Sequence, residues 1–296
     1  FGPSGISAPT PDLLDRKVEG DVWNTGEREV WGGALNVYYD INDAISLTSI
    51  TSYRGYDVGI VQEADPWLNF GPAGAGTFVA TAANDQSQKQ FTQEVRLAGD
   101  AKDFSWLFGL YYYAETLENY QNFLFTLNTG SFLAGGSTID DSKTTTDSYA
   151  AFGSANLRLT DLLSVSGGLR YTINDRRVRV GESYGVDGFD PLYGEYVDYL
   201  SLDDPAPRDY DATIFFPVNK NKIQDKVLTG DFTLTADWTD EISTYVKYAR
   251  GFKGGGFNAS FNSGFSGGVV KPEYMDSIEA GLRSYLFDKM LRFNVT

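Results

Sequence analysis

The stretch LLSVSGGLRYTIN, residues 162–174, alternates between two kinds of side chain. Side chains on a β-strand point to opposite faces with a period of two, so each phase describes one face. One face carries the apolar set Leu163, Val165, Leu169, Tyr171 and Ile173, and the other carries the polar set Ser164, Ser166, Arg170, Thr172 and Asn174. The stretch therefore predicts a β-strand between an apolar and a polar environment.

The same alternation recurs along the chain and predicts about ten strands in five pairs. The two members of each pair are separated by a few residues rich in Asp, Asn or Lys, as a tight hairpin requires. The predicted pairs cover residues 30–41 with 44–56, 90–99 with 103–115, 148–160 with 162–174, 226–238 with 241–252, and 273–287 with 290–296.

The connections between these pairs are long, and they are rich in Gly, Asp, Ser and Pro. They are expected at about residues 57–86, 116–146, 177–224 and 253–271, with a further one before residue 29. Strict alternation of short and long connections places all short turns at one end of an up-and-down sheet. Transmembrane β-barrels have this asymmetry, with short periplasmic turns and long extracellular loops.

Charged residues distinguish a membrane barrel from a soluble sandwich, which also alternates. Charges in the middle of the predicted strands all take the polar phase: Glu94, Arg96, Arg158, Arg170, Asp231, Lys247, Glu279 and Arg283. Charges in the apolar phase lie only toward the long loops: Glu29, Lys89, Asp147, Lys226, Arg250 and Asp276. A lipid-facing Lys or Arg costs about 2–4 kcal/mol at the bilayer midplane and about 0–1 kcal/mol near the interface. The distribution follows that gradient and favours the membrane barrel.

Composition excludes several classes of function. The 296 residues include no cysteine and no histidine, so disulfides, Cys-ligated zinc and His-dependent triads are impossible. A net charge of −16 argues against a nucleic-acid partner. The longest apolar run has only about ten residues, which is too short for a transmembrane helix. Acidic loop residues lack EF-hand spacing and indicate a solvated surface, so no metal site, cofactor or catalytic residue is predicted.

The stretch YARGFKGGGFN, residues 248–258, is not a phosphate-binding loop, because Lys253 precedes the glycines and no helical period follows. Together with KPEYMDSIEAGLRSYLFDKMLRFNVT, residues 271–296, it resembles the barrel of TonB-dependent outer-membrane receptors. The matching positions are Tyr248, Arg250, Gly251, Phe252, Gly254 to Gly256, Phe257, Asn258, Pro272, Glu273, Glu279, Gly281, Leu282 and Asn294. The segments 45–57, 91–112 and 163–172 resemble the family's mid-barrel strands.

The resemblance implies an all-β, antiparallel transmembrane β-barrel in the bacterial outer membrane. Family barrels have about 22 strands, consistent with the even strand numbers of such barrels, and an N-terminal plug fills the lumen. Residues 1–296 are therefore expected to form the β-barrel portion, about ten strands, with the plug and the remaining strands not in this chain. Implied partners are the TonB-ExbB-ExbD complex acting through the plug, and outer-membrane lipid and lipopolysaccharide.

The function implied is import of a scarce large solute, with a ferric siderophore as the first expectation. An anionic ferric chelate would use basic and aromatic side chains facing the lumen or the loops. The candidate ligand-binding residues are Arg54, Trp67, Tyr184, Tyr245, Lys247 and Lys253. For each of them a structural role, in ion pairs along the wall or in aromatic packing, is the competing interpretation.

Other functions remain open from the sequence. A cobalamin or glycan receptor of the same family would share every feature above, whereas haem is disfavoured because the chain has no histidine. A passive porin-type channel would show the same alternation but would have no plug. An outer-membrane hydrolase would use a catalytic histidine, so no enzyme activity is expected. A soluble β-rich adhesin would purify without detergent.

Overall fold

The computed structural model describes residues 24–63, 77–128, 133–185, 222–257 and 269–296. Within them the chain forms twelve strands: β1 (Thr25–Asn42), β2 (Ile45–Glu63), β3 (Thr77–Ala101), β4 (Phe104–Asn128), β5 (Leu133–Arg158), β6 (Leu163–Gly185), β7 (Lys222–Asp237), β8 (Ile242–Lys253), β9 (Gly256–Phe257), β10 (Val269–Val270), β11 (Glu273–Leu286) and β12 (Leu291–Val295). In the described part of the chain no helix has the length and apolarity that crossing a membrane would require.

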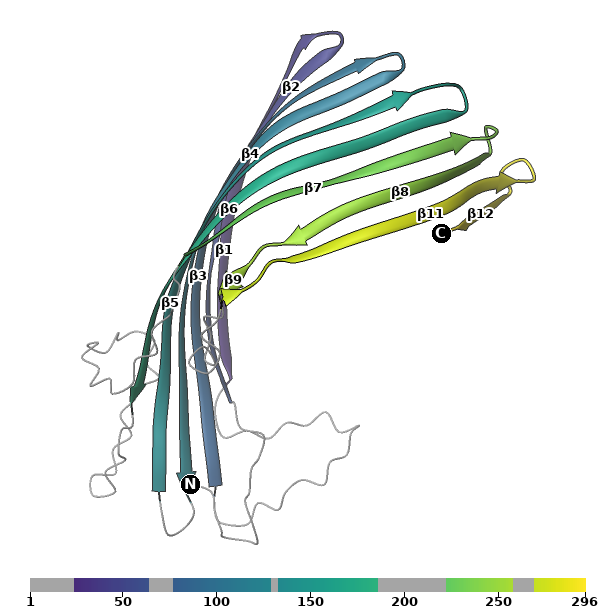
Figure 1. The fold of residues 1–296 in the computed structure, drawn as a ribbon. Helices are drawn as coiled ribbons and strands as arrows, with labels where there is room; N and C mark the ends of the chain where they lie inside the picture. The colour runs from purple at the N-terminus through teal and green to yellow at the C-terminus, as the bar shows by residue number, and fades with distance from the viewer. Residues whose placement is uncertain (1–23, 64–76, 129–132, 186–221, 258–268) are drawn as a thin grey trace.

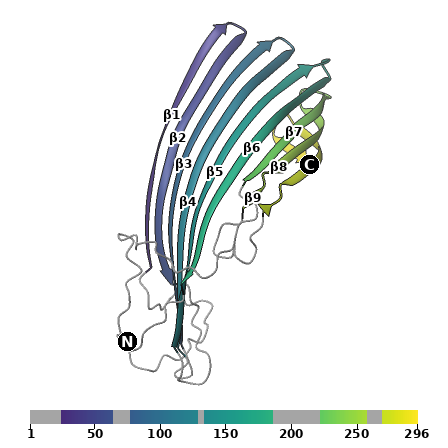
Figure 2. The same cartoon turned by 60° about the vertical axis from the view of Figure 1, so that its left-hand side comes forward.

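Ten of these strands form one antiparallel sheet in the order β1-β2-β3-β4-β5-β6-β7-β8-β11-β12, while β9 and β10 pair separately. The sheet is strongly curved and open, with β1 and β12 as its edge strands (Figures 1 and 2). The five predicted hairpins are all present, and their turns lie together at one end of the sheet (Figure 1). The predicted antiparallel, up-and-down architecture is therefore confirmed.

Polar side chains close the short turns by bonding to the backbone, as Asn and Thr do in tight turns. Asn42 Oδ1 accepts a hydrogen bond from the Ala44 amide at 2.9 Å. Thr160 Oγ1 accepts from the amides of Leu162 and Leu163, and Thr239 Oγ1 accepts from those of Glu241 and Ile242. These local bonds fix the register of the hairpins.

The strands extend further from the turns than the alternation predicted, so the expected loop boundaries at 57–86 and 116–146 are wrong. Strand β2 continues to Glu63, and β4 and β5 remain paired as far as Asn128 and Leu133. The expected loop at 177–224 begins only after β6 ends at Gly185, and the one at 253–271 contains the β9–β10 pair. Far from the turns both faces carry polar residues, so the period-two pattern disappears although the ladder continues.

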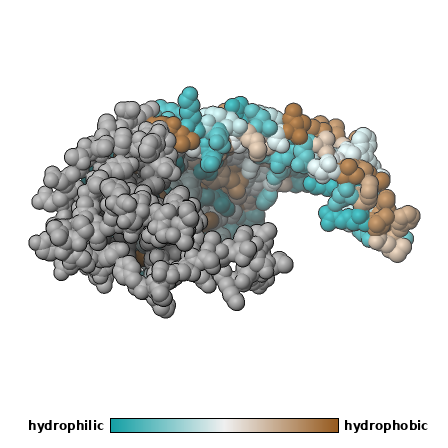
Figure 3. All heavy atoms as spheres, turned by 90° about the horizontal axis from the view of Figure 1, so that it is seen from below, coloured by the Kyte–Doolittle hydropathy of each residue, from teal (hydrophilic) through white to brown (hydrophobic). Residues whose placement is uncertain are grey.

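The two faces of the sheet have the chemistry that the sequence predicted. The apolar face exposes large side chains in the strand segments near the turns, among them Leu35, Phe108, Leu110, Leu169, Leu228, Phe232, Val246 and Ile278. Aromatic rings on neighbouring strands contact each other on this face. Trp31 contacts Tyr53, and Tyr112 contacts both Phe91 and Tyr149. Trp106 and Phe108 also lie in this phase, opposite Ala155 and Gly153 on β5. Figure 3 shows the sheet as an arc on which apolar and polar side chains alternate.

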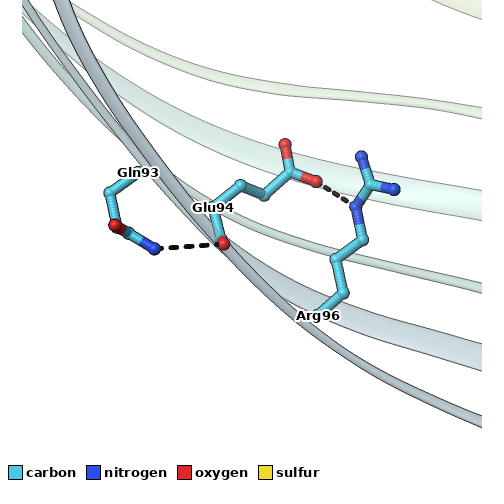
Figure 4. A network of polar contacts seen from close by, with 3 residues as sticks. All are labelled: Gln93, Glu94 and Arg96. Carbon is cyan, nitrogen blue, oxygen red and sulfur yellow. Dashed lines mark hydrogen bonds and ion pairs between the residues drawn. The ribbon is translucent and has the colours of Figure 1, made fainter. Parts of the chain in front are cut away.

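One polar residue on the apolar face, Gln93, is paired with neighbours on β2. Its Oε1 accepts from Thr51 Oγ1 at 2.6 Å, and its Nε2 donates to Ser49 Oγ at 3.0 Å and to the Glu94 carbonyl at 3.2 Å. Figure 4 shows Gln93 on the opposite side of β3 from Glu94 and Arg96. Polar groups in hydrocarbon must be satisfied within the protein, and these hydrogen bonds meet that requirement.

Candidate ligand-binding face

The polar face of β2 to β7 carries many Arg, Tyr and Gln side chains. The register aligns them in rows that run across the strands. One row contains Arg54, Gln90, Glu115, Thr146 and Arg176, each on the strand next to the previous one. Residues directly opposite on neighbouring strands have Cβ atoms about 5 Å apart, so the row forms a continuous surface.

Hydrogen bonds hold the first half of this row in place. Arg54 donates from Nε and Nη2 to Gln90 Oε1 at 3.2 and 3.0 Å. Glu115 Oε2 accepts from Gln88 Nε2 at 2.5 Å and from the Tyr113 hydroxyl at 2.6 Å. The row therefore presents a guanidinium and a carboxylate whose positions are both fixed by neutral partners.

Arg170 on β6 is held by aromatic rings. Its guanidinium carbon lies 5.1 Å from the ring centroid of Tyr111 and 5.4 Å from that of Phe152. Phe152 can take this position because it lies over Gly109, where an added Cβ would be only 2.3 Å from the ring. Arg170 Nε also donates to Thr172 Oγ1 at 3.2 Å. A guanidinium supported on two rings is suited to planar anionic or phenolic groups.

Glu94 and Arg96 form a close ion pair along β3 on the same polar face (Figure 4). The ion pair lies beside Tyr111, since Glu94 is directly opposite Tyr111 in the register. It neutralises one carboxylate next to Arg170. The other arginines on this part of the face are Arg54, Arg170 and Arg176, and the carboxylate of Glu115 lies in the same row as Arg54 and Arg176.

A shallow pocket of about 330 Å³ lies farther from the turns, on β1 to β3. Its lining is half apolar and half polar: Arg28, Val30, Tyr56, Val58, Ile60, Asn84 and Gln86. The Tyr56 hydroxyl donates to Gln86 Oε1 at 2.8 Å. Tyr56 therefore supplies a phenol on the pocket wall whose hydroxyl is held by Gln86.

The glycine triplet that follows β8 packs against the same face. The buried Asp225 carboxylate accepts a hydrogen bond from the Gly255 amide at 2.9 Å, and Arg176 Nη1 donates to the Gly255 carbonyl. A Cβ at position 254 would lie 3.2 Å from Asn174 Nδ2, and one at 255 would lie 2.9 Å from the Val270 carbonyl oxygen. These glycines therefore let the backbone leave β8 and approach Asn174 on β6 and Asp225 on β7.

The six predicted ligand-binding residues do not form one cluster. Arg54 lies in the row described above, and Tyr184 lies on β6, paired with Thr138. Tyr245, Lys247 and Lys253 all lie on β8, far across the sheet from Arg54. Trp67 lies outside the described residues.

Tyr245 is engaged in wall contacts. Its hydroxyl donates to Glu279 Oε1 at 2.5 Å, and the Arg283 guanidinium carbon lies 4.7 Å from its ring centroid. Lys247 lies directly opposite Glu279 in the register, and the exposed Lys253 lies opposite Glu273. Tyr245 thus has contacts within the wall, whereas Lys247 and Lys253 face carboxylates in the register, and binding of a ligand by these residues stays a prediction.

The sequence did not single out Arg176, Tyr56, Tyr111, Phe152 or Asp225. Their contacts with other strands depend on the register between strands, which the sequence of a single strand does not reveal. In the described part of the chain no group of three or more acidic side chains could hold a metal ion.

Comparison with known proteins places the whole sheet in context. Residues 3–296 match the family model described as TonB dependent receptor-like, beta-barrel. The fold is similar to the ferric yersiniabactin uptake receptor FyuA from Yersinia pestis, with a TM-score of 0.59, 17% identity, and coverage of 88% of this chain and 34% of the receptor. It is also similar to BauA, the ferric preacinetobactin receptor from Acinetobacter baumannii, with a TM-score of 0.52, 14% identity, and coverage of 89% and 36%. No curated protein matches. The chain thus spans about a third of each of these two solved receptors.

Proposed function

Because this chain belongs to the TonB-dependent receptor β-barrel family, whose members are integral outer-membrane barrels, we propose that it forms part of the wall of a receptor that imports a ferric siderophore. The family comprises receptors and transporters and is not an enzyme class. On this proposal residues 1–296 supply barrel strands only, and the plug and the remaining strands lie outside this chain. The TonB-ExbB-ExbD complex would act through that plug.

The observation that carries the ligand assignment is the set of three arginines on the polar face. In an outer-membrane barrel the polar face lines the lumen, because the apolar face meets lipid. Arg54, Arg170 and Arg176 are positioned there by Gln90, by two aromatic rings and by Gly255, respectively. Such a surface suits a large anionic chelate with planar, oxygen-rich arms. The two similar solved structures are receptors for ferric siderophores, which supports the same class.

The transport step itself requires little chemistry from this chain. The wall binds the solute through charge-assisted hydrogen bonds and aromatic stacking. Release follows when an external energy source shifts the population of plug conformations. Residues of the wall therefore determine affinity and selectivity, and the energy-coupling partner determines the rate.

The proposal is tested by uptake of ⁵⁵Fe in a deletion strain complemented with the complete gene. The probes are a ferric hydroxamate, a ferric catecholate and a ferric phenolate chelate, each at nanomolar concentration. Saturable uptake of at least one chelate, abolished by removing the membrane energy source, is the expected result. Uptake of none of them, together with unsaturable passage of small sugars into proteoliposomes, would indicate a passive channel instead.

A further inference from the structure

Glu115 on β4 is a carboxylate of the polar face that is held by neutral groups. Its Oε2 accepts hydrogen bonds from Gln88 Nε2 at 2.5 Å and from the Tyr113 hydroxyl at 2.6 Å. Within the described residues no lysine or arginine forms an ion pair with Glu115, and no group donates to its Oε1. The side chain is half-buried, so its free lone pairs can be reached from the polar side of the sheet.

The two arginines of the same row have other partners. Arg54 and Arg176 each lie two strands from Glu115, on opposite sides of it, which corresponds to about 10 Å across a sheet. Arg54 donates to Gln90 Oε1 at 3.0 Å. Arg176 donates to the Gly255 carbonyl. Both guanidinium groups are therefore held by neutral acceptors, just as the carboxylate is held by neutral donors.

The row thus presents a cation, an anion and a second cation in order from β2 to β6. A solute with only anionic groups would be attracted by Arg54 and Arg176 but repelled by the carboxylate between them. A solute with a cationic group between two anionic groups would complement all three side chains. The charge order of the row therefore favours a solute of mixed charge over a purely anionic one.

Tyrosines accompany the carboxylate on the same face. Tyr113 lies two residues before Glu115 on β4, and Tyr56 on β2 is the register partner of Gln88, the other donor to Glu115. An ammonium group is attracted by the face of an aromatic ring and forms charge-assisted hydrogen bonds with a carboxylate. The surroundings of Glu115 therefore have the chemistry of a site for an amine.

We propose that Glu115 binds a protonated amine of the imported solute, so that the preferred substrates are ferric chelates with a pendant ammonium group. Arg54 and Arg176 bind anionic oxygens on either side of that amine. The assignment rests on the proposed function, because it concerns which ferric chelates the wall selects.

The test uses the three chelate classes of the uptake experiment, each prepared in two forms that differ in one pendant amine, either free or acetylated. Acetylation removes the positive charge of the amine and leaves the metal centre unchanged. Tryptophan fluorescence titration of the purified complete protein gives the Kd of each form. Within the class that is taken up, the free amine should bind at least about tenfold more tightly, as expected for a hydrogen bond between charged groups.

Glu115→Gln removes the charge but keeps an oxygen that can accept from Gln88 and Tyr113. This variant should bind the two forms of the chelate equally well. It should bind the acetylated form at least as tightly as the unaltered protein does, because repulsion of the anionic groups is relieved. A purely structural role of Glu115 would instead weaken the binding of both forms.

Asp231→Asn is the matched control. It removes a carboxylate from the same polar face, on β7 and nearer to the short turns, where the side chain is exposed. The control should keep the full preference for the free amine. Loss of the preference in the control would overturn the proposal, because the summed charge of the polar face would then select the amine.

The remaining outcomes separate this inference from the proposed function. Equal binding of the two forms by the unaltered protein would overturn the inference and leave the proposed function standing, and it would indicate that Glu115 pairs with a basic side chain of the plug. A preference that persists in Glu115→Gln would overturn the inference as well, since another group would then bind the amine. Uptake of no chelate in either form would overturn the proposed function and this inference together.

Discussion

The ring of Tyr245 lies directly over Gly281 on the adjacent strand, so that a Cβ at position 281 would be only 2.4 Å from Tyr245 Cε1. The missing side chain allows the phenol to reach Glu279 and to stack under the guanidinium of Arg283. The wall of the barrel is therefore built from large side chains that occupy the space above glycines. The same arrangement recurs where Phe152 lies over Gly109 and Trp106 over Gly99.

Replacing Gly281 with alanine should therefore displace the ring of Tyr245. Overpacking of this kind costs about 1–3 kcal/mol, measured as the free energy of unfolding in urea. Gly251→Ala is the matched control, because nothing lies within 4 Å of a Cβ at that position on the paired strand. Equal unfolding free energies for the two variants would contradict the observed packing.

The assignment of faces predicts opposite results for two substitutions on β6. Leu169 is 63% exposed on the apolar face, whereas Ser166 faces the polar side. Leu169→Arg should destabilise the folded protein in lipid by about 2–4 kcal/mol, since the charge would enter the hydrocarbon. Ser166→Arg should cost less than about 0.5 kcal/mol, as substitutions in an aqueous environment do. Folded fractions across a urea series in liposomes measure the destabilisation by each substitution. A smaller destabilisation by Leu169→Arg than by Ser166→Arg would contradict the assignment of the apolar face to lipid.

Arg54 should contribute to binding of whichever ferric chelate is taken up. Arg54→Gln removes a charge-assisted hydrogen-bond donor, so the Kd should rise by at least about tenfold. Arg250→Gln serves as the control because Arg250 lies on the apolar face, beside Asp276. Tryptophan fluorescence titration of the purified complete protein gives both values. A Kd for Arg54→Gln within twofold of the control would remove Arg54 from the binding surface.

Asp225 should anchor the glycine segment to the wall. Asp225→Ala leaves the buried Gly255 amide without its acceptor, which costs about 1–3 kcal/mol of unfolding free energy. Limited proteolysis should also cut the chain after β8 faster than in the unaltered protein. Asp231→Ala, on the same face of β7 but exposed, should change neither quantity. If both variants are cleaved at the original rate, Asp225 does not hold this segment.

The sequence predicted the hairpins and both faces because hydrocarbon imposes a period of two wherever it contacts a strand. It did not predict the strand extensions beyond residue 57 or residue 116, since water lies on both sides there and no alternation is required. The binding surface was only partly predictable, for a different reason. Arg170 was recognised as a polar-phase charge, but its contacts with Tyr111 and Phe152 depend on the register of three strands.

Strands β4 and β5 contain 25 and 26 residues, more than twice the length that spans the membrane. At about 3.3 Å per residue such strands extend about 80 Å along their axes. The paired part of β4 and β5 that lies farthest from the short turns should therefore extend beyond the lipid headgroups. Antibodies raised against its tip should therefore recognise intact cells, even where surface sugars cover shorter proteins.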